Sequence, residues 1–595
     1  MAKGKDLFSY GNTKNHPHRS PFDLSKRRLF SSKVGELLPV WWKPTLPGDK
    51  WTISADMFSR TQPVQTAAYT RIVEQMDFFF VPYRLLWRNS PSSFTQMAEA
   101  RNVAQSLRAT QAINERLPHV SLGQLFDAVT NNTQTAAPST TLGAYVRDEC
   151  NQLTKLQCFK LLAYLGYFPS DKFSLFYGNV KSEAEATKQL EIITTGSSFD
   201  RNKLVSLMPL LAYQKVYFDF YRNQFWEEDQ AQAHNVDYMT TSTNIADYDT
   251  SSTGKDLYMS GMLTLRYANF AKDLFFGLLP TAQYGEVAQV SISEGGTATI
   301  PKGTQISDSE RIVTAANPSR GVQTATDYNS DGNVSLKSDT SLSSFLLSKP
   351  VVTSSAITAN VTALNSAITA IDVRAMMATQ KWREISNTGD RTYRSQIEKH
   401  FGVHLPALLE NNATYIGGWD NQITINEEVN TNLAGDNDAN IKGKGIGSSS
   451  CKKLSFECKE HGIIIGIYHS RPYIDYDLSG QDRNIATINI ADIPQPEFDQ
   501  LGLEPVTYDE FWYGSSGFNG ATIGYAPRYY NYKTDVDDCV GRIRVVEPDW
   551  CALYDSTFAK SSLYTPSNYS LGNALKIDPN LLNDIFGVQA SVSDA

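Results

Sequence analysis

Alternation of apolar and polar positions marks the chain from residue 34 to residue 81 and predicts strands. The apolar run 37–42 ends at the turn signal Leu-Pro-Gly-Asp at 46–49. Residues 51–58 place Trp51, Ile53, Ala55 and Met57 on one side, the pattern of a half-buried strand. Residues 78–81 are continuously apolar, which is typical of a strand buried on both faces.

A helical period replaces this alternation between residues 92 and 230. Residues 92–117 and 121–130 have a helical composition. Residues 145–167 and 204–226 carry apolar side chains at steps of three and four, which predicts amphipathic helices. The helices therefore read as insertions between β segments.

Residues 286–370 differ from the rest of the chain in composition. Ser and Thr make up 26 of these 85 residues, and Tyr328 and Phe345 are the only aromatic residues. A segment of this kind supplies little core, so we expect an exposed surface insertion.

The remaining sequence turns helical over 371–385, stops at 387–389, and then returns to β. We expect strands at 415–427, 454–468 and 540–546, and a Gly/Asn/Ser loop at 435–450.

An apolar stripe with a period of 3.5 residues crosses the end of the insertion. It consists of Ile357, Val361, Leu364, Ile368 and Ile371 and continues through Ala375, Ala378, Trp382 and Ile385. The pattern predicts a helix from about 355 to 385, capped by Ser354 or Ser355. Its stripe would pack either on its own subunit or on two further copies around a three-fold axis.

Strands at both ends of the chain with long insertions between them favour one β-sandwich. We expect a mainly β protein with helical insertions, a single eight-stranded antiparallel jelly roll with long loops. Its parts are a basic N-terminal arm (1–33), first strands with helical insertions (34–285), the Ser/Thr-rich insertion (286–370), and a helix with the remaining strands and tail (371–595).

Composition bounds the class of protein. Of the 595 residues, 41% are hydrophobic and 11% aromatic, which is ample for a large core and excludes wholesale disorder. No apolar run approaches the roughly 18 residues of a membrane span, so we expect no membrane insertion. The six cysteines include no CxxC pair and read as reduced thiols of a protein made in a cytoplasm.

Charge is concentrated at the N-terminus. Residues 1–33 carry a net charge of +6, whereas the whole chain carries −9. A basic arm on an acidic body predicts contact with an anion such as nucleic acid, although solvated tails share this composition. The candidate residues are Lys3, Lys5, Lys14, Arg19, Lys26, Arg27 and Arg28.

Motifs for catalysis and for metal or cofactor binding are weak. His400 and His404 stand four apart without the Glu of a zinc protease motif, and Cys451 and Cys458 lack a second pair. The glycine-rich stretch 443–449 lacks the spacing of a phosphate loop. We therefore predict no enzyme, no cofactor and no metal site.

A second aromatic and basic cluster lies near the C-terminus. It contains Tyr525, Arg528, Tyr529, Tyr530, Tyr532 and Lys533. Interleaved rings and cations suit a single-stranded nucleic acid surface, but also an aromatic packing segment or a subunit interface, which we favour.

A colinear series of motifs resembles one family. The motifs include Gly-x-Leu-x-Pro-Val at 35–40, Phe-Phe-Phe-Val-Pro at 78–82, Leu-Ala-Tyr-Gln-Lys-Val-Tyr at 211–217, His-Gly-Ile-Ile-Ile-Gly at 461–466, and Gly-Tyr-x-Pro-Arg-Tyr at 524–529. In this order they resemble the major capsid protein of microviruses, small icosahedral phages with circular single-stranded DNA, and in particular the gokushovirus-like branch.

The resemblance implies a jelly-roll subunit that self-assembles through pentamers into a T=1 shell of sixty copies. It further implies a single-stranded DNA genome inside, pilot and small internal or scaffolding proteins as partners, and assembly in the bacterial host cytoplasm. The insertion 286–370 stands where relatives carry a three-fold protrusion, and it is our candidate for contact with an unknown host receptor.

One alternative comes from a different class. Jelly rolls also occur in carbohydrate-binding and glycan-processing proteins. The absence of a marked pair of catalytic carboxylates speaks against it.

Overall fold

The computed structural model describes residues 19–64, 68–95, 117–125, 154–167, 200–238, 261–283, 370–387, 392–406, 411–429, 441–450, 452–476, 481–499, 502–511, 520–547, 550–554, 575–579, 581–582 and 585–586, and short strands between 297 and 360. The chain forms two compact units. Residues 1–282 and 389–595 make the first, and residues 283–388 make the second.

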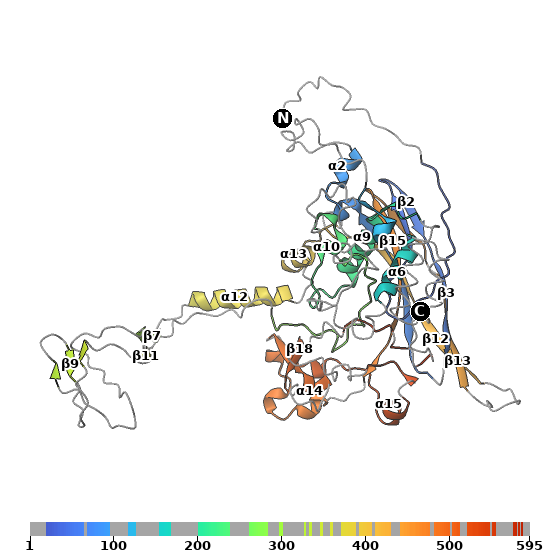
Figure 1. Ribbon diagram of the computed structural model, residues 1–595. Coiled ribbons are helices and arrows are strands. Elements are labelled where there is room, and N and C mark those ends of the chain that lie inside the picture. The colour runs from blue at the N-terminus through green and yellow to red at the C-terminus, as the bar shows by residue number, and fades with distance from the viewer. Residues whose placement is uncertain are drawn as a thin grey trace, which may run out of the picture. The chain divides into compact units, whose positions relative to one another are not determined.

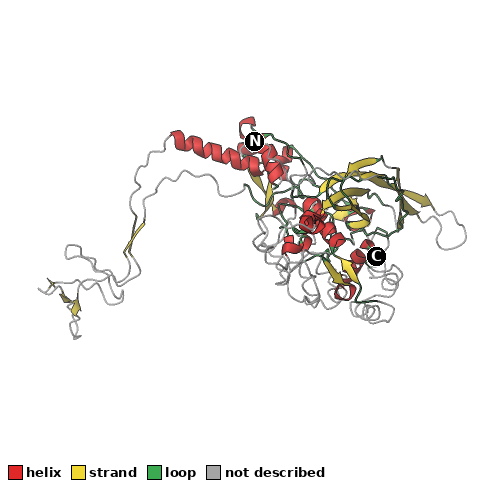
Figure 2. Cartoon of the chain, turned by 90° about the horizontal axis from the view of Figure 1, so that it is seen from above, coloured by secondary structure: helices red, strands yellow, loops and turns green. Residues whose placement is uncertain are grey.

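A curled antiparallel sheet is the largest sheet of the first unit, with helices beside it (Figures 1 and 2). Its six strands lie in the order β1 (Leu38–Thr45), β15 (Gly462–Pro472), β4 (Ile72–Pro82), β12 (Thr414–Val429), β13 (Ile441–Ser450) and β3 (Asp56–Val64). Four of the five neighbouring pairs join an N-terminal strand to a C-terminal one, and β12 with β13 is the exception, so the sheet unites the two β regions that the sequence separates.

The central strands are buried on both faces, as the run 78–81 predicts. Phe79 and Val81 join the larger core, whereas Phe78 and Phe80 join a smaller core on the other face. Alternate residues of the neighbouring β15 divide in the same way, with Ile463 and Ile465 in the larger core and Ile464 in the smaller. The pleat therefore explains why an unbroken apolar run is needed here.

Helices pack against one face of the sheet. The helix α9 (Met208–Val216) contacts β4 and β15 and continues as a π-turn over Tyr217–Tyr221, and α6 (Thr154–Leu165) contacts β1. Short helices follow β4: α1 (Tyr83–Leu86) and α2 (Ser90–Thr95). Further short elements are α10 (Ala231–His234), α13 (Tyr393–Phe401) and α14 (Tyr508–Phe511).

The helical expectations hold in the described residues with shifted bounds. The helix expected within 145–167 is confirmed by α6. The helix expected within 204–226 begins only at Met208, because Leu204–Ser206 forms the strand β6, which pairs with β5 (His119–Ser121). Within 92–117, α2 ends at Thr95, and most of the expected helix lies outside the described residues.

The single strand expected at 51–58 is wrong. The segment divides into β2 (Lys50–Ile53), which pairs with β14 (Leu454–Glu457), and β3, which pairs with β13. The two halves belong to different sheets, and Ser54 and Ala55 between them belong to neither strand. Two-stranded pairs β16 (Asp475–Tyr476) with β19 (Leu553–Tyr554), and β17 (Leu503–Thr507) with β18 (Thr522–Pro527), complete the unit.

The loop expected at 435–450 is also wrong for residues 441–450, which form β13 between β12 and β3. Glycine is required there because neighbouring side chains occupy the space of a side chain. A Cβ on Gly445 would lie 2.6 Å from Thr61 Cγ2 and 2.9 Å from Ile423 Cγ2.

The strand expected at 540–546 is a helical turn, α15 (Arg542–Val546). Gly541 precedes it at a φ of +74°, which interrupts extended backbone. The turn also pairs with no neighbouring strand among the described residues, so the β-branched side chains alone do not make a strand.

The second unit contains α12 (Ala370–Asn387) and the short strands β7 (Thr297–Ile300), β8 (Asp327–Tyr328), β9 (Asn333–Ser335), β10 (Leu346–Ser348) and β11 (Ile357–Asn360). The helix expected at 371–385 is therefore confirmed. Its extension to 355 is wrong, because Ile357 pairs with Ile300 in a β-ribbon. Threonine and isoleucine there favour extended backbone.

The protein is thus mixed, with more strand than helix, as the β sequence with helical insertions predicts. The largest sheet of the described strands has six strands and is curled, and the eight-stranded jelly roll stays a prediction. No helix in the described ranges has the length and hydropathy to cross a membrane.

Candidate nucleic-acid interface

The N-terminal arm, here residues 19–33, lies extended along the sheet and is fastened at two points. At the first, Arg19 forms an ion pair with Asp49 at 2.7 Å and donates a hydrogen bond to the Pro47 carbonyl at 2.6 Å. The turn at 46–49 presents both acceptors. Gly48 has a φ of +84° and the Arg19 guanidinium lies against it, so glycine is needed there.

The second fastening is Arg28. Its guanidinium donates hydrogen bonds of 2.7 Å to the carbonyls of Val40 in β1 and Tyr164 in α6. It also lies over the Tyr164 ring, 5.2 Å from the centroid. Next to it, Phe30 packs edge-on against Tyr468 with 5.0 Å between centroids. The donors of Arg28 are thus used within the subunit.

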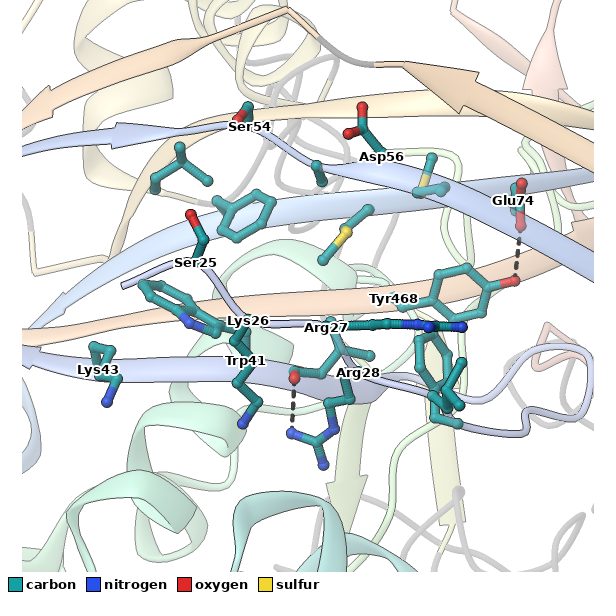
Figure 3. A pocket seen from close by; sticks show the side chains of 18 of the residues that line it. Ser25, Lys26, Arg27, Arg28, Trp41, Lys43, Ser54, Asp56, Glu74 and Tyr468 are labelled. Carbon is teal, nitrogen blue, oxygen red and sulfur yellow. Dashed lines mark hydrogen bonds between the residues drawn. The ribbon is translucent and has the colours of Figure 1, made fainter. Parts of the chain in front are cut away.

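Between these points the arm leaves Lys26 and Arg27 over a groove (Figure 3). Partial burial lowers the pKa of Lys26, and the positive charges of Arg28 and Lys43 lower it further. Lys26, Arg28 and Lys43 therefore lie close enough together to repel one another.

The groove has a cavity volume of about 2650 Å³ and contains residues of both edge strands, β1 and β3. Its lining includes nine basic residues and four carboxylates, a net charge of +5 within a chain of net charge −9. The basic residues are Arg19, Lys26, Arg27, Arg28, Lys33, Lys43, Lys50, Arg60 and Lys444. An acidic protein therefore presents one strongly basic groove to a polyanion.

Aromatic rings accompany these charges. The Phe58 ring is exposed on β3, and the Arg60 guanidinium lies 5.0 Å from its centroid. Trp41 and Trp51 also line the groove and meet edge-on at 5.7 Å. Exposed rings next to cations can stack on unpaired bases, which is how single-stranded nucleic acids are held without sequence preference.

The sequence points only to the arm as a source of this surface. Lys3, Lys5 and Lys14 lie outside the described residues. Lys43, Arg60 and Lys444 come from strands distant in sequence, and a linear charge count cannot show them together. One signal is visible in β3, where Phe58 stands on the polar side of an alternating strand.

The second cluster, 525–533, is used largely inside the subunit. Tyr530 is buried and its hydroxyl donates a hydrogen bond to Glu510, while burial raises the pKa of that carboxyl. Tyr529 is buried and Lys533 pairs with Asp499. Arg528 lies 5.3 Å from the Tyr529 ring, Tyr525 is partly buried in β18, and Tyr532 is exposed. This geometry supports packing.

The apolar stripe is placed only in part. Ile357 lies in β11, and Ile371 lies exposed on α12. Val361, Leu364 and Ile368 lie outside the described residues.

The other candidate ligands do not assemble into a metal site in the described ranges, where no group of three potential ligands occurs. His404 lies 3.5 Å from Glu398 and 3.2 Å from Arg394, while His400 is on α13. Cys158, Cys458, Cys539 and Cys551 are buried thiols and form no disulfide, and the Cys551 thiol donates to Cys539 Sγ at 3.8 Å.

Comparisons with known proteins identify the family to which the chain belongs. The model of a phage protein family described as Capsid protein (F protein) matches residues 12–145 and 190–567, more than half of the chain. The capsid protein VP1 of Chlamydia phage 1 is 25% identical over 193 residues, which are 31% of this chain and 32% of that relative. The match thus spans about a third of the relative's length.

These matches confirm the resemblance seen in the motif series. The family consists of structural proteins, which sets aside the glycan-processing alternative. The chain therefore belongs to the F-type capsid proteins of microviruses, the structural subunits of the phage virion.

Proposed function

We propose that sixty copies of this chain assemble through pentamers into a T=1 shell that encloses circular single-stranded DNA, with the arm and its groove on the inner face. The observation that carries the proposal is the groove itself, with a net charge of +5 on a chain of −9. The separation of charge gives the subunit one side suited to a polyanion and leaves the rest acidic.

The curled sheet is proposed as one sheet of a jelly-roll sandwich. Its antiparallel pairing and its neighbours from distant parts of the sequence support this. Jelly rolls join such strands across the ends of the sandwich, where insertions are accommodated.

A basic partner is part of the proposal. Sixty copies at −9 each carry −540, so the shell as a whole does not neutralise a genome. Small internal proteins or polyamines would supply the remaining positive charge, while the groove positions the DNA against the subunit. Pilot and scaffolding proteins are further proposed partners.

The test reverses the charges of Lys26 and Arg27, for which no hydrogen bond within the subunit is described. The double variant K26E/R27E of the full-length chain should bind single-stranded DNA with a weaker salt dependence. Losing two phosphate contacts makes the slope of log K against log salt less steep by about 1.4. Particles of this variant should contain less DNA per shell, measured by quantitative amplification.

The matched control is K452E/K453E, which reverses two exposed lysines outside the groove lining. This control should keep the parental slope and DNA content. A slope for K26E/R27E equal to that of the parent would refute the role of the groove.

A further inference from the structure

A short segment of the first unit, residues 481–499, displays a row of aliphatic side chains in solvent. Ile485, Ile488, Ile490 and Ile493 are all exposed, and Ile488 and Ile490 are 85% and 84% exposed. Four large aliphatic side chains exposed within nine residues indicate an interaction surface.

The backbone under these side chains is held in place by its own hydrogen bonds. The Asp482 carboxylate accepts from the Asn484 N–H at 2.8 Å, and the Asp492 carboxylate accepts from the Asn489 N–H at 2.9 Å in a capping box. The segment does not fold inward to bury its isoleucines, so it is preorganised for a partner.

The segment is also tied to the body of its unit. Asn531 donates to Asn484 at 3.2 Å, and Arg483 lies 3.4 Å from Glu510. Lys533 pairs with Asp499. These contacts set its position without covering the apolar side chains.

Its charge indicates which kind of surface would cover it. Residues 481–499 contain four carboxylates and one arginine, a net charge of −3. A complementary surface must therefore be apolar and basic.

The chain carries a face of that chemistry on α13 and the residues after it, 402–406. Tyr393 and Phe401 are 78% and 77% exposed, and Val403 is exposed beyond the helix end. None of the helix residues is buried. Arg394 and Lys399 against Glu398 give residues 392–406 a net charge of +1, and the segment also contains His400 and His404.

We propose that residues 481–499 of one subunit dock on the α13 face of a second copy of this chain, pairing an acidic apolar surface with a basic apolar one. The inference rests on the proposed self-assembly and names a contact that makes it. If either face paired with its own copy, like charges would meet and repel. The opposite charges of the two faces therefore favour pairing of one face with the other.

The direct test places the photo-reactive amino acid benzoylphenylalanine at position 488. Shells are assembled from a mixture of isotope-labelled and unlabelled chains, irradiated, and analysed by mass spectrometry. The expected product links position 488 to a peptide within 392–406, with labelled chains joined to unlabelled ones. Links to other segments only, or within single chains only, would overturn the proposal.

A second test uses I488D/I490D, which places charges at two exposed positions and leaves the core untouched. It should reduce particle yield at least tenfold while its thermal melting matches that of the parent. The control V540D makes a similar change at an exposed apolar position outside both faces and should assemble normally. Normal assembly of I488D/I490D would also overturn the proposal.

Failure of the two proposals is distinguishable. A parent chain that forms no shells contradicts the proposed function. Parent shells with cross-links elsewhere contradict only this contact.

Discussion

Arg28 shows how one residue of a basic triplet differs from its neighbours. Its two carbonyl acceptors lie 12 and 136 residues away, so it joins the arm to β1 and α6 at once. Lys26 and Arg27 have no such contacts described, and they remain the members of the triplet suited to phosphate.

The variant R28A should therefore destabilise the subunit by about 2–4 kcal/mol, because it removes charge-assisted hydrogen bonds and a cation–π contact. Urea unfolding of the full-length chain measures the loss. R27A, one position earlier, should change stability by less than about 0.5 kcal/mol. Equal effects of the two variants would show that Arg28 does not anchor the arm.

His469 in β15 predicts a dependence of stability on pH. Burial lowers its pKa from 6.5 to about 3, with a further contribution from Arg471. Because the folded pKa is depressed, the unfolded chain takes up the proton first as the pH falls. Folding stability should drop by about 2 kcal/mol between pH 7 and pH 5 from this residue alone.

The measurement is denaturant unfolding at both pH values for the parent and for H469Q, which cannot titrate. The drop should shrink in H469Q by about 2 kcal/mol. H404Q, at an exposed histidine, serves as the control and should retain the full drop. An unchanged drop in H469Q would contradict the assignment.

For single residues, the sequence predicts where basic side chains are concentrated, but it does not predict which groups each of them contacts. The count of basic residues finds the arm, but the choice between Arg27 and Arg28 depends on acceptors that only folding brings near. The same holds for Lys43 and Arg60, whose place in the groove depends on both edge strands.

Among the elements, β13 depends most on its neighbours. Its glycines at 445 and 447 lie where side chains of β3, β4 and β12 already fill the space. Composition alone predicts a loop, because the reason for glycine lies in other strands. The amphipathic helices and the strand β4, which is buried on both faces, were predictable. The spacing of their apolar residues lies within the element itself.

The variant G445A should therefore destabilise the sheet by about 1–3 kcal/mol, as overpacking does. A Cβ there would meet Thr61 at 2.6 Å, and pairing of Gly445 with Ile425 of β12 limits how far the backbone can move. Thermal melting of the full-length chain is the measurement. S448A, at an exposed position of the same strand, should melt like the parent.

Two further elements show the limits of local patterns. The β-branched run at 540–546 has no partner strand among the residues that the structure describes and becomes a helical turn, while the heptad-like run near 357 has a partner and becomes a strand. In both cases the presence or absence of a pairing strand agrees with the structure better than the spacing of apolar residues does.

For the whole molecule, the second unit can be tested by removal. Because residues 283–388 form a compact unit of their own, they can have a role separate from that of the first unit. Deleting residues 290–345 should leave shell formation intact and abolish adsorption to host cells, if this insertion is the attachment site. Electron microscopy and an adsorption assay give the two readouts, and unchanged adsorption would exclude the role.

The pairing of β1 with β15 has a consequence for synthesis. Thr45 and its partner Gly462 are 417 residues apart. At about 5–20 residues per second, roughly 20–80 s pass before the ribosome supplies that partner. During this time β1, which contains Trp41 and Trp42, lacks its pairing strand β15. The nascent chain therefore exposes an unpaired strand edge with aromatic side chains. Pairing of β1 therefore has to wait until the C-terminal part of the chain has been synthesised.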